Sequence, residues 1–379
     1  MADIKTHLRE LSVAVTVGLL LRKYDFCLNE LYNSDRFIKY AKEIIENDIS
    51  SASNLLIMDN FSPKLCQIIN NGYNLGEKIY QSDEFDIDEF SVIQWKGNDT
   101  QKDDPVDIVI GKYGFSLKEE SFILENMGLY KLLNCFTGST YRKRHIFKDY
   151  ALYEYRNWFS VTWNEMLKDV EDCGKVWCFD NIKKLKKSII KITDNDVIFE
   201  YYDNKKLIAN SILPKKCTLE MFEDKTSSKT REKVFSKFIN QILDNNPNYN
   251  NAKRECAIVA TKNLAKELTE NLNYSAGIPR FLRIHEFSYY YAKTTANGSV
   301  IYKVPALADF KDNIVIDSIV SSVPNKQANI LTTIRNKRTG KKLILRNECR
   351  FSHGQFNGTP EAKMYYEQGG SLLVIYEPI

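Results

Sequence analysis

The stretch Asp104-Pro-Val-Asp-Ile-Val-Ile-Gly-Lys-Tyr-Gly-Phe-Ser-Leu-Lys-Glu-Glu120 decides the fold that we expect for this chain. Two runs of strand-forming residues flank the segment Gly111-Lys-Tyr-Gly114, whose glycines favour a tight turn. This pattern predicts a hairpin of two antiparallel strands. With the turn at residues 111–114, Asp107 should lie directly opposite Lys118.

The predicted hairpin has one apolar and one polar face, because side chains alternate along a strand. The apolar face carries Ile108, Ile110, Phe115 and Leu117, and the polar face carries Asp107, Ser116, Lys118 and Glu120. A carboxylate beside a lysine suits metal-assisted hydrolysis of phosphodiesters. The carboxylate binds a hard cation such as Mg²⁺, and the lysine orients or deprotonates the attacking water. The polar face is therefore a candidate catalytic site.

A complete site of this kind normally needs a second carboxylate. Glu120 is the nearest candidate by strand alternation, and we favour it as the second metal ligand. Glu125, at the start of the next predicted helix, and Glu10, in the predicted N-terminal helix, are the alternatives. In the non-catalytic interpretation, Asp107 and Lys118 form only an exposed ion pair on a surface hairpin, worth under about 1 kcal/mol.

These residues resemble the motif of the PD-(D/E)xK nuclease superfamily, and in particular that of the type II restriction endonucleases. The resemblance rests on Glu10 in a predicted N-terminal helix, on Pro105-Val-Asp107 and on Ser116-Leu-Lys118, and it covers about residues 1–136. It implies that Asp107 binds the metal and that Lys118 positions the water. The sequence departs from the family pattern at Val106, which separates Pro from Asp, and at Ser116, which replaces Asp or Glu.

The resemblance also implies the biological setting. It predicts a Mg²⁺-dependent enzyme that cuts double-stranded DNA at a specific short sequence and works as a homodimer. A cognate DNA methyltransferase would protect the host DNA. Two alternatives remain open: a non-enzymatic nucleic-acid-binding protein, and a nuclease of the same superfamily that acts in repair or on RNA.

The charge of the chain is unevenly distributed. The 379 residues carry 53 basic and 49 acidic side chains, a net charge of +4. Residues 251–379 hold 18 basic and 11 acidic residues, whereas residues 1–250 hold 35 and 38. Between Lys326 and Arg350 there are eight basic residues and a single acid, Glu348. This concentration favours binding of a polyanion by the C-terminal part.

The same region offers residues for both kinds of DNA contact. Basic side chains suited to phosphates are Lys337, Arg338, Lys341 and Lys342. Side chains suited to base edges in the major groove are Arg350, His353, Gln355 and Asn357. A polar loop between two strands of a basic domain is the alternative interpretation of the second group.

The order of the patterns predicts an α/β or α+β protein, with a mixed central sheet flanked by helices and a strand-rich basic C-terminal region. Helices are expected at residues 4–23, 125–136, 148–170 and 229–243, and a strand at 197–202. The asparagine-rich segment 244–251 is the best turn or linker signal. We expect a nuclease domain at residues 1–215 and a DNA-recognition region at residues 216–379.

Cysteine usage and hydropathy predict a cytoplasmic protein without a membrane span. The eight cysteines are dispersed and include no Cys-x-x-Cys pair, so reduced thiols are the default. The longest nearly apolar run, residues 11–21, is much shorter than the roughly 20 residues of a spanning helix.

Overall fold

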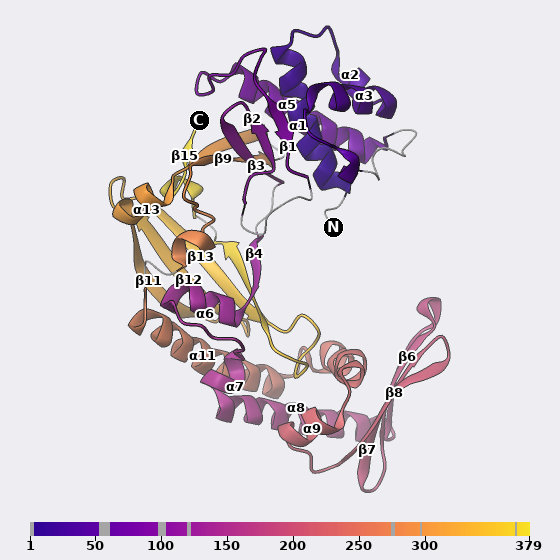
Figure 1. Cartoon of the computed structure of the whole chain (residues 1–379). Coiled ribbons are helices and arrows are strands. Elements are labelled where there is room, and N and C mark those ends of the chain that lie inside the picture. The colour runs from indigo at the N-terminus through magenta and orange to yellow at the C-terminus, as the bar shows by residue number, and fades with distance from the viewer. Residues whose placement is uncertain are drawn as a thin grey trace.

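The computed structural model describes residues 4–52, 61–97, 104–119, 123–273, 277–295, 298–367 and 370–379. The strands of these residues form three sheets of six, five and four strands. In Figure 1 the six-stranded sheet and the N-terminal helices lie at one end, the five-stranded sheet lies in the middle, and the four-stranded sheet lies at the other end. The predicted mixture of helices and sheets is thus confirmed. No helix of these residues is long and apolar enough to cross a membrane.

Two long helices, α1 (Ile4–Leu21) and α5 (Pro63–Gln81), pack tightly against each other beside the six-stranded sheet. The predicted N-terminal helix is therefore present, and most of its side chains are buried. The contact with α5 depends on Gly72, where a Cβ atom would lie 2.5 Å from the Cβ of Ser12. Shorter helices at this end of the molecule are α2 (Leu28–Leu31), α3 (Ser34–Ile44) and η1 (Ser50–Ala52).

The six-stranded sheet has the order β1-β2-β3-β9-β10-β15. Its strands are β1 (Ile93–Trp95), β2 (Ile108–Ile110), β3 (Tyr113–Glu119), β9 (Tyr289–Thr295), β10 (Gly298–Val304) and β15 (Glu377–Pro378). Among its described pairs only β3 and β9 are parallel, so the sheet is mixed. The predicted apolar face of the hairpin is buried in one core with α1 and α5, because Ile108, Ile110, Phe115 and Leu117 are at most 1% exposed.

The hairpin forms where the sequence predicts it, but its register is shifted by two residues. Ile108 pairs with Phe115 and Ile110 with Tyr113, so only Gly111 and Lys112 form the turn. Gly111 adopts a positive φ of 58°, which suits glycine at the start of a two-residue turn. The expected direct opposition of Asp107 and Lys118 is wrong, because Lys118 lies two residues beyond the position that this register pairs with Asp107. A shift of two residues preserves the face of every side chain, so the predicted polar and apolar faces are unchanged.

The five-stranded sheet is antiparallel and has the order β11-β12-β13-β14-β4. Its strands are β11 (Ile314–Ser322), β12 (Ala328–Asn336), β13 (Lys342–Arg350), β14 (Glu361–Tyr366) and β4 (Ile123–Gly128). The predicted helix at residues 125–136 is only partly present, because β4 pairs with β14 and α6 (Leu129–Thr137) begins after it. The long helix α11 (Pro247–Glu270) packs on β11 and β12.

The segment predicted as a linker at residues 244–251 is mostly the start of α11. Asn246 caps the helix by accepting a hydrogen bond from the Tyr249 N–H, and Pro247 occupies the first turn. Proline fits there because the first N–H groups of a helix have no partner within the helix. Other short helices of the middle region are α7 (Ile146–Tyr150), α12 (Ile278–Phe281), α13 (Leu307–Asn313) and η5 (Leu372–Val374).

The four-stranded sheet is a meander of β5 (Val176–Asn181), β6 (Lys186–Ile192), β7 (Asp196–Asp203) and β8 (Lys206–Pro214). It follows α8 (Leu152–Asp172), which fills most of the predicted helix at 148–170. The short helix η2 (Ile182–Lys184) links β5 and β6. The helical run predicted at 229–243 is present as η3 (Thr230–Phe235), α10 (Ser236–Phe238) and η4 (Ile239–Leu243), and α9 (Leu219–Lys225) precedes it.

Strands from distant parts of the sequence meet in two of the sheets. β9 and β10 lie beyond the expected boundary at residue 215, yet they belong to the sheet that holds Asp107 and Lys118. Conversely, β4 lies before that boundary and pairs with β14. Each end of the chain therefore contributes to the core of the other.

Candidate active site

Asp107 is held at the start of β2 by the hairpin itself. Its N–H donates to the carbonyl oxygen of Phe115 on β3 (2.8 Å). Its carboxylate atom Oδ2 accepts a hydrogen bond from the N–H of Leu117 (2.6 Å). Because both contacts come from the partner strand, the orientation of the carboxylate is fixed by backbone pairing.

Lys118 lies beside Asp107 as the alternation predicts. Its ammonium donates to Asp107 Oδ2 at 3.0 Å, and the hydroxyl of Ser116 lies 3.5 Å from the same oxygen. The side chain of Asp107 is 14% exposed and that of Lys118 is 31% exposed. This ion pair is therefore half-buried at the edge of the core. The three donors converge on Oδ2, which leaves Oδ1 for any further ligand.

Glu10 of α1 lies near enough to Asp107 and Lys118 for their charges to act on it. It is 4% exposed, and its Oε2 accepts a hydrogen bond from the indole N–H of Trp95 on β1 (2.8 Å). Burial raises the pKa of Glu10 to about 7, and repulsion from Asp107 acts in the same direction. The hydrogen bond from Trp95 and the charge of Lys118 oppose this rise. Glu10 is thus within electrostatic reach of both Asp107 and Lys118.

Further charged side chains surround the three residues. Arg9, the neighbour of Glu10 on α1, is 7% exposed and lies 3.5 Å from Glu119 at the end of β3. The ammonium of Lys96 lies 4.0 Å from Asp104, just before the hairpin. Acidic and basic groups alternate here, as they do at sites that bind both a cation and a phosphate.

The predicted second carboxylate is placed only in part. Glu120 lies outside the described residues, so its side chain has no described position. Glu125 lies on β4 of the five-stranded sheet rather than on a helix, and its side chain is likewise outside the description. Among the three candidates, the structure brings Glu10 to Asp107. Within the described part of the chain, no three His, Cys, Asp or Glu residues form a metal-binding group.

The four basic residues predicted to bind phosphates lie together on the turn between β12 and β13. Lys337, Arg338, Lys341 and Lys342 are all exposed. Arg338 lies 2.8 Å from Glu377, and Lys342 lies 3.5 Å from Asp317. We call this group the basic turn.

The four residues predicted to read bases lie at and after the end of β13. Arg350 and His353 are exposed, and Gln355 donates to the side-chain oxygen of Asn240 (3.1 Å). We call residues 351–358 the β13–β14 loop. β13 spans nine residues, which places this loop roughly 26 Å from the basic turn, at about 3.3 Å per residue. The two groups therefore lie at opposite ends of one strand.

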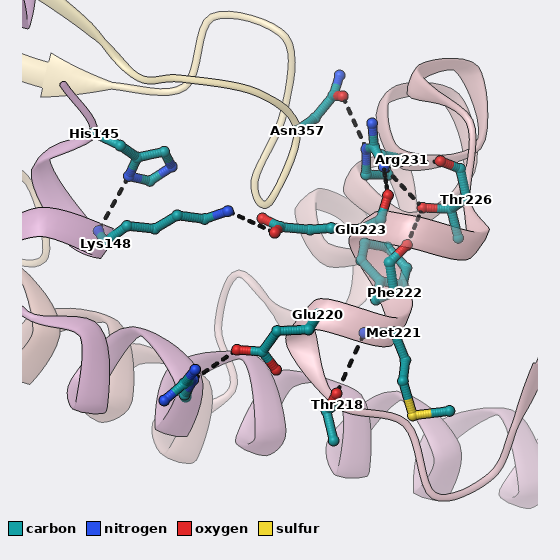
Figure 2. A network of polar contacts seen from close by, with 11 residues as sticks. His145, Lys148, Thr218, Glu220, Met221, Phe222, Glu223, Thr226, Arg231 and Asn357 are labelled. Atoms are coloured by element: carbon teal, nitrogen blue, oxygen red, sulfur yellow. Dashed lines mark hydrogen bonds and ion pairs between the residues drawn. The ribbon is translucent and has the colours of Figure 1, made fainter. Parts of the chain in front are cut away.

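Asn357 is not available for contact with DNA bases. It is 7% exposed, and its amide nitrogen donates to the carbonyl oxygen of His353 (2.9 Å). Figure 2 shows Arg231 of η3 turned toward Asn357, and its Nε donates to the amide oxygen at 3.2 Å. Arg231 also donates to the carbonyl oxygens of Glu223 and Thr226. Asn357 therefore fixes the β13–β14 loop to the helical layer, and the prediction of a base contact is withdrawn.

Sequence reasoning missed the two residues that control Glu10. Trp95 was visible only as the last residue of a strand-forming run, and Arg9 only as a neighbour of Glu10. A tryptophan on a buried strand needs an acceptor for its N–H, and here that acceptor is the carboxylate of Glu10. Comparisons with protein-family models, with curated proteins and with solved structures find no match to this chain.

Proposed function

We propose that this protein is a Mg²⁺-dependent endonuclease that hydrolyses phosphodiester bonds of double-stranded DNA at a specific short sequence, as type II restriction endonucleases do. The observation that carries the proposal is the convergence of Glu10, Asp107 and Lys118 between α1 and the hairpin. The family resemblance implies roles for Asp107 and Lys118, and Glu10 belongs to the motif on which the resemblance rests. They come from two segments about 100 positions apart, so their meeting depends on the fold rather than on adjacency in the sequence.

The donor set fits Mg²⁺. This ion is usually held by one or two carboxylates together with water and phosphate oxygens of the substrate. Glu10 and Asp107 supply two carboxylates, and their mutual repulsion contributes to the raised pKa of Glu10. A divalent cation between them would relieve that repulsion. We therefore propose Glu10 as a metal ligand beside Asp107. The role of Glu120 as a metal ligand remains a prediction.

Each residue of the site has a defined part in the proposed reaction. When bound, Mg²⁺ offsets the charge that builds on the phosphate and lowers the pKa of a water molecule. The Leu117 N–H keeps Asp107 in one orientation, and Trp95 does the same for Glu10. The ammonium of Lys118 orients the attacking water and stabilises the developing negative charge.

Binding of the duplex and the biological setting extend the proposal. The basic turn supplies phosphate contacts, and Arg350, His353 and Gln355 supply base contacts. Cleavage of both strands requires two sites, hence a homodimer, and protection of host DNA requires the cognate methyltransferase. These partners follow from the family resemblance alone.

The test is incubation of the purified protein with plasmid DNA and Mg²⁺. Discrete fragments are expected from the wild type. Asp107→Asn and Lys118→Ala should each lower cleavage at least a hundredfold and leave DNA binding nearly unchanged, because they remove groups that act on the transition state.

Matched controls are Asp86→Asn and Lys112→Ala, which remove an exposed ion pair at the turn of the same hairpin. They should cleave normally. Unspecific degradation would favour the repair or RNA nuclease, and retardation of DNA without cleavage would favour the non-enzymatic binding protein. Normal cleavage by Asp107→Asn would overturn the proposed site.

A further inference from the structure

A cavity of about 190 Å³ lies between α7, α8, α11 and the C-terminal end of β13. Its wall includes Arg350 and Gln355, but it belongs to neither the candidate active site nor the basic turn. Pockets for drug-sized ligands measure about 300–1,000 Å³, so this cavity has room for one small ring system.

The wall of the cavity is aromatic on one side. The rings of Phe147 and Phe351 stack with centroids 5.7 Å apart and an interplanar angle of 24°. Trp158 packs against Phe147 edge to face at 5.6 Å. Flat aromatic surfaces of this kind bind nucleobases by stacking, which is worth about 1–3 kcal/mol per base.

The other side of the cavity is cationic. Lys253, Lys326 and Arg350 line it, and no acidic residue of the described chain does. Lys326 is engaged with Asp244 and Asn250 (both 2.7 Å), and Arg350 lies 3.3 Å from Glu348. Lys253 forms no ion pair within the part of the chain that the structure describes. Burial and the charge of Lys326 lower its pKa to about 8.

Lys253 is half-buried, and an anion beside it would offset the cost of taking its charge partly out of water. Lys253 lies 5.8 Å from the centroid of the Trp158 ring, so its charge and the aromatic side face the same space. A ligand that combines a flat ring with a phosphate would satisfy both.

Trp158 and Gln355 bring hydrogen-bonding groups to the same wall, and Tyr249 packs against Trp158 next to it. Trp158 Nε1, Tyr249 Oη and Gln355 Oε1 are buried and have no hydrogen bond of ordinary geometry. Both Trp158 and Tyr249 are only 1% exposed. The three groups lie next to one another, because Gln355 and Trp158 both interact with the hydroxyl of Tyr249. Trp158 and Gln355 also line the cavity, where the donors and acceptors of a nucleobase edge could bond to them after small side-chain rotations.

We propose that this cavity is a nucleotide pocket that holds one nucleobase and its phosphate, taken from a base turned out of the DNA duplex. The stack of Phe147 and Phe351 covers the base, Lys253 binds the phosphate, and Gln355 contacts the base edge. The β13–β14 loop is fixed by Arg231 and Asn240, so the pocket exists before the ligand arrives. The source of the base rests on the proposed function, because it assumes DNA as the substrate.

Binding is tested with the full chain in the absence of divalent cations. Calorimetry with each of the four deoxynucleoside 5′-monophosphates and with inorganic phosphate measures the pocket itself. At least one nucleotide should bind more than tenfold tighter than phosphate. Lys253→Gln should weaken its binding at least tenfold, whereas Lys262→Gln, an exposed lysine of the same helix, should change it less than twofold.

Phe351→Leu separates stacking from charge, because it should weaken nucleotide binding and leave phosphate binding unchanged. Lys253→Gln removes a half-buried charge, so it should raise the melting temperature while it lowers affinity. That combination distinguishes a binding residue from a structural one. Equal binding of phosphate and nucleotides, or no binding of any nucleotide, would overturn the proposal.

The source of the base is tested with a duplex that carries 2-aminopurine opposite an abasic position, compared with its fully paired counterpart. Tighter binding of the first duplex, abolished in Lys253→Gln, supports capture of a base from DNA. Equal binding of both duplexes, with nucleotides still bound, overturns that source and assigns the pocket to free nucleotides. Plasmid cleavage is scored separately, so a failed nuclease proposal and a failed pocket proposal give different results.

Discussion

At the scale of the residue, Glu10 is the group whose ionisation governs the proposed site. Its pKa in the folded protein is raised from 4.5 to about 7, so folding takes up a proton between these values. The folded state is therefore stabilised at low pH, and this stabilisation is lost as the pH rises from about 4.5 to 7. The Mg²⁺ ion of the proposed site would bind the ionised carboxylate, so adding the cation should reverse the trend.

This linkage gives a prediction for Glu10→Gln. In the wild type without cations the melting temperature should fall between pH 5 and pH 8, and Mg²⁺ should restore it at pH 8 but not at pH 5. In the variant, the fall of the melting temperature with pH and its recovery with Mg²⁺ should both shrink to less than half. Calorimetry measures both changes.

Glu119→Gln is the control, because this carboxylate lies at the end of β3 and its side chain is 54% exposed. It should behave like the wild type. An unchanged response of Glu10→Gln to Mg²⁺ would exclude Glu10 as a ligand.

The sequence predicts which hairpin side chains meet at the candidate site, but it does not predict which side chains from other elements surround them. Asp107, Ser116 and Lys118 share a face in any register that differs by two residues, so the error in the turn did not affect the site. The contact between Glu10 and Trp95 joins positions 85 residues apart. No local pattern encodes such a pair, since it arises when α1 packs on the sheet.

At the scale of the element, local patterns succeeded where one segment determines its own structure. The helices α1 and α8 lie close to where apolar periodicity predicts them. Local patterns failed for β4, where residues 125–128 carry a helical pattern. This strand forms because it pairs with β14, more than 200 residues later, and completes the sheet. Tertiary pairing overrides weak local propensity in such cases.

The basic turn is an element whose proposed role is testable by salt dependence. Replacing Lys337, Arg338, Lys341 and Lys342 by glutamine should weaken binding to all duplexes about equally. It should also reduce the slope of log affinity against log salt by roughly one for each phosphate that the variant no longer neutralises. Fluorescence anisotropy at two salt concentrations measures both quantities.

The comparison variant replaces four exposed lysines at the tip of the four-stranded sheet, at positions 183, 184, 205 and 206. It should leave the salt slope nearly unchanged. A larger loss of affinity in this variant than in the basic-turn variant would move the DNA interface to the four-stranded sheet.

At the scale of the whole molecule, the six-stranded sheet makes the two halves of the chain interdependent. β9 lies beside β3 in parallel, with Ser116 opposite Tyr291 and Lys118 opposite Lys293. Without β9 and β10, β3 would be an unpaired edge, and the core would lose Tyr290, Ala292 and Ile301. The expected boundary at residue 215 separates these partners.

We therefore predict that residues 1–215 do not fold as a unit. Circular dichroism of this fragment should show no cooperative melting. In a matched chimera, a flexible linker of about 15 residues joins residue 119 to residue 289. This length suffices because a parallel pair needs a crossover of a dozen or more residues. The chimera should regain a cooperative transition. Cooperative melting of the 1–215 fragment would contradict the prediction.

The parallel pair also sets when the proposed site can be completed during synthesis of the chain. The start of β9 emerges 170 residues after the end of β3, which takes roughly 9 to 34 s at about 5–20 residues per second. Until then Asp107 and Lys118 belong to an incomplete sheet. For the proposed nuclease, this order of synthesis would keep the nascent chain inactive on the ribosome, and a truncated product would not attack the DNA of the cell that makes it.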